Sequence, residues 1–194
     1  MSDLLLRAVI GGILPIINRG YTRVLGIRPL NENSIISIEL RRHKGRPVRL
    51  EDGCEVRPGD RVIKLHLNNA WIAEGLRSGP ESGRGFPRGL IYYFRDGLRL
   101  LAAEVADGKH GGLVAVYGWT AFHGHAGRLG FQVIDLPDSL RIKLAQLHIS
   151  ALMQAHHIPW LRRHSTFDSP LDVKAVWLSR AELLRLHGPV SSAG

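Results

Sequence analysis

Alternating hydrophobic and polar residues predict strands in the first half of the chain. Over residues 34–42, Ile36, Ile38 and Leu40 occupy every second position, with polar residues between them, which is the pattern of a half-buried strand. Residues 61–67 alternate in the same way and are expected to form a second strand. Between the two runs lies an Asp-Gly pair with a short apolar stretch on each side, a pattern that predicts a small β-hairpin.

In the second half of the chain, the apolar residues have the spacing of a helix. Leu90, Phe94, Leu98 and Leu101 follow one another at steps of three or four positions, as on one face of a helix. Strands early and alternating elements late predict an α+β (or mixed α/β) fold, in which helices pack on one mixed sheet of about five main strands. The expected later elements are a helix to about residue 107, a strand over 113–117, a short helix over 120–129, a strand over 131–134, a long helix from 137, a strand over 173–178 and a last helix with a capping box formed by Ser179 and Glu182.

Residues 1–20 contain an apolar segment that needs its own interpretation. Residues 4–17 are apolar apart from Arg7, but a helix that spans a membrane needs about 20 such residues. We therefore expect an N-terminal helix packed against a core of residues 21–190, within a single domain of 194 residues. Peripheral contact of residues 4–17 with a membrane surface is the alternative.

Cysteine content indicates a reducing compartment. Cys54 is the one cysteine, so the chain can form neither an internal disulfide nor a zinc site built from thiolates. The expected location is cytoplasmic, where any membrane contact is with the inner face. Signatures of phosphate loops, hydrolase elbows and zinc proteases are missing from the sequence, and neither a metal nor a cofactor is predicted.

The net charge of the chain is +9, which suits nucleic acid, acidic lipid or an anionic glycan as a partner. The arginines are spread through every expected element rather than gathered in a stripe, so nucleic acid is not expected. Residues 39–46 form a dense basic run, which we interpret as a solvated strand end and turn. An anionic or glycan ligand is the partner that we expect.

Polar side chains gather at the end of the second predicted strand. Period-two alternation puts Lys64, His66 and Asn68 on one face, called here the strand-end face. Asp60 precedes the strand and Asn69 follows it. An ammonium, an imidazole and amides could hold a phosphate or sugar hydroxyls, and His66 could transfer a proton near neutral pH. The alternative is structural: the two asparagines cap a following short helix, and His66 lies on a polar sheet face.

A second group of polar residues lies in the short helix predicted over 120–129. A strand-to-helix turn presents backbone amides that favour an anion, and Arg128 could add charge there. His123 and His125 lie on different sides of a helix, so a metal site is not predicted. Two classes of function stay open: a binding module at the strand-end face, or a small hydrolase or transferase with His66 or His123 as its general base.

Three segments together carry a resemblance to a known family. They are Arg46 to Trp71 with GDRVIKLHLNN, Thr120 to Val133 with GRLGFQV, and Val176 to Gly188 with WLSRAELLRLHG. On these segments the chain resembles the YkoP-like domain family of bacteria. Such domains occur alone or fused to polysaccharide deacetylases in spore-forming and related bacteria, so the resemblance implies a role linked to sporulation or to envelope or spore glycans. No paired Asp-Asp with an HxxxH metal motif is present, so deacetylase chemistry is not carried over.

Overall fold

The computed structural model describes residues 25–68, 90–121, 123–136, 143 and 172–189. Contacts divide the chain into two compact units, residues 1–28 with 137–172 and residues 29–136 with 173–194. The elements below belong to the second unit, except that the first strand begins one residue before it. Three predicted features lie outside the described residues: the N-terminal helix, Asn69 with the short helix after it and, apart from residue 143, the long helix from residue 137.

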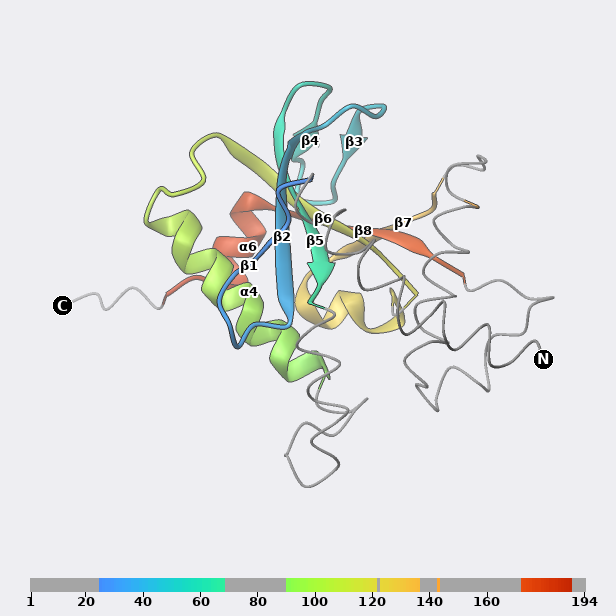
Figure 1. The fold of residues 1–194 in the computed structure, drawn as a ribbon. Coiled ribbons are helices and arrows are strands. Elements are labelled where there is room, and N and C mark those ends of the chain that lie inside the picture. Colours follow the sequence, from blue (N-terminus) through green and yellow to red (C-terminus); the bar gives the residue numbers. More distant parts are fainter. Residues whose placement is uncertain (1–24, 69–89, 122, 137–142, 144–171, 190–194) are drawn as a thin grey trace, which may run out of the picture. The chain divides into compact units, whose positions relative to one another are not determined.

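Six strands form one mixed sheet in the order β1-β2-β5-β6-β8-β7, and two short strands form a separate hairpin (Figure 1). This arrangement confirms the predicted α+β fold with helices on a mixed sheet, and it adds a two-residue edge strand, β1, to the expected set. The described elements are β1 (Arg28–Pro29), β2 (Ile36–Arg42), β3 (Val48–Arg49), β4 (Glu55–Val56), β5 (Arg61–Leu67), α4 (Leu90–Ala106), β6 (Leu113–Thr120), the 3-10 helix η3 (His123–Leu129), β7 (Gln132–Ile134), β8 (Lys174–Ser179) and α6 (Arg180–His187).

The register of the central strands fixes which side chains share a face. β2 and β5 run antiparallel, with Ile36 opposite Leu67 and Glu39 opposite Lys64. β5 and β6 run parallel, and parallel neighbours need a crossover connection such as the one that contains α4. The Asp-Gly hairpin is confirmed: β3 and β4 pair antiparallel, and Gly53 has a φ of 84° that suits glycine in a tight turn.

Hydrophobic clusters cover both faces of the sheet. On the first face α4, α6 and η3 pack on the sheet through residues such as Leu98, Leu129 and Leu183 (Figure 1). On the second face Val62, Tyr117, Trp177 and their neighbours form another cluster, to which the β3–β4 hairpin contributes. The alternation predicted for β2 is wrong in two ways: Ser37 and Glu39, expected on the polar face, are only 5% exposed, whereas Leu40, expected on the buried face, is 46% exposed.

The predicted short helix over 120–129 differs from the structure in extent and type. β6 continues through Thr120, and the following turn is the tighter 3-10 helix η3. Gly124 and Gly127 disfavour a longer α-helix here because glycine loses the most backbone entropy on ordering.

The capping box predicted at the start of α6 is half formed. Ser179 Oγ accepts the Glu182 amide at 3.0 Å, but the Glu182 carboxylate binds Arg185 instead of reaching back. Ser179 is also the last residue of β8, paired with Ala115 across the ladder, so it already belongs to the sheet. None of the described helices is long and apolar enough to cross a membrane.

Candidate functional site

The strand-end face lies on the second face of the sheet, where β5 meets β2. His66 Nε2 is 2.9 Å from Glu39 Oε2, so Nε2–H donates to this carboxylate. Lys64 Nζ lies over the ring of Trp119, 4.7 Å from its centroid, which is a cation–π contact. The predicted Lys64 and His66 are thus neighbours on one face, and each already has a protein partner.

Glu39 gives His66 the surroundings of an oriented base. The Glu39 side chain is 7% exposed and also lies 3.4 Å from Arg41 Nη1. The pKa of His66 is lowered by burial and by the charges of Lys64 and Arg41, while Glu39 opposes this effect. A neutral imidazole that donates through Nε2–H keeps its lone pair on Nδ1. This arrangement can accept a proton at Nδ1, as a base held by a carboxylate does.

Asp60 and Asn68 hold the ends of β5 in place. Asp60 Oδ2 accepts the backbone N–H of Arg57 at 2.6 Å, in the turn before the strand. Asn68 Nδ2 donates to the carbonyl of Ser34 at 3.0 Å, and the Asn68 amide donates to the carbonyl of Ile35 at 2.7 Å. Both predicted residues therefore have backbone partners at the places where the strand begins and ends.

His123 and Arg128 lie in η3, which packs through Leu129 against the first face of the sheet. His123 is half-buried and lies close enough to Asp135 for its charge to lower the pKa of that carboxyl, after the larger effect of Lys174. Arg128 is exposed. The structure thus places Arg128 on the face opposite Lys64 and His66, since η3 packs on the side that these residues do not share.

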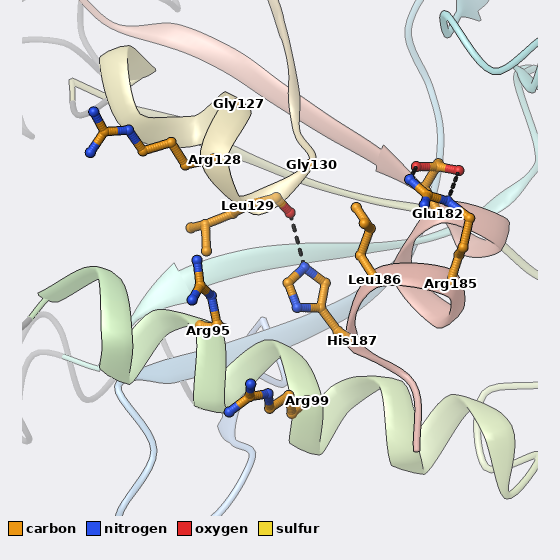
Figure 2. A pocket seen from close by; sticks show the side chains of 10 residues that line it. All are labelled: Arg95, Arg99, Gly127, Arg128, Leu129, Gly130, Glu182, Arg185, Leu186 and His187. Atoms are coloured by element: carbon orange, nitrogen blue, oxygen red, sulfur yellow. Dashed lines mark hydrogen bonds and ion pairs between the residues drawn. The ribbon is translucent and has the colours of Figure 1, made fainter. Parts of the chain in front are cut away.

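Arg128 lies instead in the wall of a pocket between α4, η3 and α6 (Figure 2). The pocket has a volume of about 460 Å³, within the range of sites for small molecules. We call it the arginine pocket. It is lined by Arg95, Arg99, Gly127, Arg128, Leu129, Gly130, Glu182, Arg185, Leu186 and His187.

Positive charge dominates the walls of the arginine pocket, where four arginines face one glutamate for a net formal charge of +3. Glu182 and Arg185 neutralise each other through two hydrogen bonds of 2.8 and 2.6 Å. Arg99 contacts Asp96 at 3.1 Å, an ion pair in which both side chains are more than 60% exposed and which therefore adds little stability. Within the described part of the chain, Arg95 and Arg128 have no carboxylate partner.

Arg95 and Arg99 are one helical turn apart on α4. Residues at this spacing have Cβ atoms about 5–6 Å apart, and like charges there destabilise a helix by about 0.2–0.5 kcal/mol. Figure 2 shows Arg95 reaching from α4 toward Leu129, while Arg128 is directed away from His187. An anion bound at Arg95 and Arg99 would relieve their repulsion, and guanidinium groups bind oxyanions through paired hydrogen bonds.

His187 closes the pocket at the end of α6 and is 6% exposed. Its Nε2–H donates to the carbonyl of Leu129 at 2.9 Å. The pKa of His187 is lowered, first by burial and then by the charges of Arg95 and Arg99, against the opposite effect of the Leu129 carbonyl. These surroundings therefore hold the imidazole in its neutral form.

The sequence-based interpretation missed Arg95, Arg99 and His187. The two arginines did carry a signal, because a spacing of four on a predicted helix puts both on one face. His187 carried none: its burial depends on contact between α6 and η3, which lie 58 positions apart at the hydrogen bond. No alternation or motif in one segment predicts such a contact.

Comparison with models of known protein families shows the family of the chain. The model of the YkoP domain matches residues 7–187, nearly the whole sequence. The chain belongs to the YkoP domain family. A curated relative, the uncharacterized protein YkoP of Bacillus subtilis strain 168, is 29% identical to this YkoP domain over 107 residues. The alignment covers 54% of this chain and 57% of the relative, so the chain spans little more than half of that protein's length. No solved structure matches the chain.

Proposed function

We propose that this YkoP domain is a binding module for an anionic ligand, held in the arginine pocket by Arg95 and Arg99. The observation that supports this most directly is the imbalance of charge in an open surface pocket of about 460 Å³. Arg95 and Arg99 repel each other weakly on one face of α4, and only Arg99 has a carboxylate partner, the exposed Asp96. An anion would therefore meet positive charge that the described part of the chain does not fully neutralise. Arg128, at the edge of the pocket, adds to its positive potential.

Envelope or spore glycans with acidic groups are the ligand class that we propose. The family resemblance associates YkoP-like domains with polysaccharide deacetylases, and the charge of the pocket favours a sugar that bears a phosphate or a carboxylate. Leu129 and Leu186 form an apolar part of the wall, against which the carbon face of a ring can pack. This proposal gives the ligand a charged end at α4 and a less polar body toward α6.

Calorimetric titration with variants tests the binding function. The ligands are inorganic sulfate, a sugar phosphate and glucuronate, and the proteins are the wild type and Arg95→Gln/Arg99→Gln. We expect binding that weakens by about tenfold or more per arginine, since hydrogen bonds to charged groups contribute about 1.5–3 kcal/mol. Lys44→Gln/Arg46→Gln is the matched control, because both residues are exposed and lie in the loop after β2.

Equal binding by the two double variants contradicts the proposed site, because affinity then follows net charge and not position. Binding by the wild type but by neither double variant contradicts it for the same reason. Loss confined to Arg95→Gln/Arg99→Gln supports the arginine pocket, and the ranking of the three ligands identifies the preferred anionic group.

A second candidate function rests on the Glu39–His66 pair. A buried carboxylate that orients a histidine is the arrangement that activates a general base in many hydrolases and transferases. The lowered pKa of His66 keeps its Nδ1 free to accept a proton at neutral pH. This observation favours His66 over His123 as the base of a small hydrolase or transferase.

Turnover of model substrates tests this second function. We expect hydrolysis of p-nitrophenyl acetate or p-nitrophenyl phosphate that disappears in His66→Gln and is reduced in Glu39→Gln. His123→Gln is the control, and circular dichroism checks that each variant is folded. Rates that are the same in the wild type and in His66→Gln exclude His66 as a catalytic residue for these substrates and leave it a structural partner of Glu39.

A further inference from the structure

His187 is a buried titratable group in the wall of the arginine pocket. Its Nε2–H is used by the Leu129 carbonyl, and its Nδ1 is buried without a hydrogen-bond partner in the described structure. A buried ring nitrogen without a partner is uncommon, because most buried polar atoms are satisfied. Nδ1 of His187 is therefore the ring nitrogen whose protonation can change when a ligand binds.

Charged groups line the pocket on each element that packs around His187, although Arg128 points away from the ring. Arg95 and Arg99 lie on α4, Arg128 on η3, and the paired Glu182 and Arg185 on α6 itself. Figure 2 shows the second ring nitrogen on the side of α4, toward Arg95 and Arg99. Glu182 stays ionised at neutral pH, because Arg185 lowers its pKa. The field at His187 is thus positive and opposes a proton on the ring.

An anion in this pocket reverses the balance at His187. Its negative charge cancels part of the field of Arg95 and Arg99, so a proton on the imidazole becomes less unfavourable. Linkage makes the effect reciprocal. If a bound anion raises the proton affinity of His187 by some factor, protonation of His187 raises the anion affinity by the same factor. Without an anion, burial and the charges of Arg95 and Arg99 keep His187 neutral, and a bound anion favours the imidazolium.

We propose that a tetrahedral oxyanion, of the sulfate or phosphate-monoester class, binds at Arg95 and Arg99 together with one proton that His187 takes up from the solvent. The proton goes to Nδ1, and no covalent bond between heavy atoms changes. This inference rests on the proposed function and adds a preference to it: the site binds its anion more tightly as the pH falls. A ligand with a fixed double charge gains most from this coupling.

Calorimetry with sulfate between pH 5.5 and 8 tests the coupling, because sulfate keeps its charge across this range while phosphate does not. The wild type is expected to bind several-fold more tightly at the acidic end. Repeating the titration in buffers of different ionisation enthalpy should show uptake of up to one proton per sulfate. In His187→Gln, whose side-chain amide can still donate to the Leu129 carbonyl, affinity should be independent of pH and no proton should be taken up.

The outcomes distinguish a failure of the proton coupling from a failure of the anion site. Sulfate binding that needs Arg95 and Arg99 but shows no proton uptake overturns the role of His187 and leaves the anion site standing. A pH dependence that persists in His187→Gln has the same meaning. No sulfate binding at any pH, or equal binding by Arg95→Gln/Arg99→Gln, overturns the site and the coupling together. If His187→Gln fails to fold, the pKa of His187 in the wild type, followed by NMR of its ring proton, must rise on saturation with sulfate.

Discussion

His66 and His187 are both held neutral mainly by burial, but they have different hydrogen-bond partners. Burial lowers the pKa of each. His66 has a carboxylate partner, Glu39, which works against that shift, and His187 has a backbone carbonyl as its partner. His66 can therefore act as an oriented base, whereas His187 responds to the charge in the arginine pocket.

Exchanging the neighbours of His66 should move its pKa in opposite directions. Glu39→Gln removes a negative charge and should lower the pKa of His66 further, while Lys64→Met removes a positive charge and should raise it. NMR titration of the ring proton of His66 measures both. If neither substitution changes the pKa of His66, the contacts described between β2 and β5 are contradicted.

Sequence alone placed His66 on a polar face but could not supply its partner. Alternation along β5 decides the face of Lys64 and His66. The pairing with Glu39 depends on the register between β2 and β5, which are joined by an intervening hairpin. Arg95 and His187 come from helices at distant places in the sequence, and only packing brings them together.

At the scale of the elements, α4 has two roles. Its inner face packs on β2 and carries the core, and its outer residues Arg95 and Arg99 form one wall of the arginine pocket. The close approach to β2 occurs at Gly97, where an added Cβ would lie 2.7 Å from Ile36 Cδ1. Ile36 is fully buried, so it has little room to move aside.

Gly97→Ala should therefore destabilise the fold even though alanine favours helices. Overpacking typically costs about 1–3 kcal/mol, and the gain in helix propensity returns about 1 kcal/mol, so the free energy of unfolding should fall by up to about 2 kcal/mol. Urea unfolding measures it. Gly124→Ala in η3 is the control, because a Cβ there meets no atom within 4 Å. A stabilised Gly97→Ala would show that α4 does not approach β2 so closely.

The periodicity of apolar residues predicted the strands and helices better than it predicted their tertiary contacts. β5 and β8 came from alternation and α4 from helical spacing, because each pattern is local. The second hydrophobic cluster was not predicted, since the hairpin residue Val56 and the β8 residue Trp177 reach it from separate segments. Glycines in η3 turned an expected helix into a 3-10 turn, which a count of apolar positions does not detect.

At the scale of the whole molecule, the two neutral histidines should make stability depend on pH. A histidine with a lowered pKa stays unprotonated in the folded state while the unfolded chain takes up a proton near pH 6.5. The free energy of unfolding should therefore decrease as the pH falls below about 6.5, by up to about 1.4 kcal/mol per pH unit for each histidine. Carboxyls such as Asp135 add to the loss at lower pH, since the pKa of Asp135 is lowered by Lys174.

Urea unfolding at pH 7 and pH 5.5 measures this dependence. The His66→Gln/His187→Gln variant should lose less stability between the two pH values than the wild type does. His125→Gln is the control, because His125 is exposed in η3. Equal losses in the wild type and the double variant would contradict the neutral state of both histidines.

The arginine pocket is central to the proposed function, and NMR of the arginine side chains during a sulfate titration tests it most directly. Each Nε–Hε group reports on its own surroundings, so a site can be told apart from general attraction to a chain of charge +9. We expect the signals of Arg95 and Arg99 to shift together and to saturate, while exposed Arg46 shows small changes that follow ionic strength. Equal, unsaturated shifts of all three arginines would contradict an anion site in this pocket.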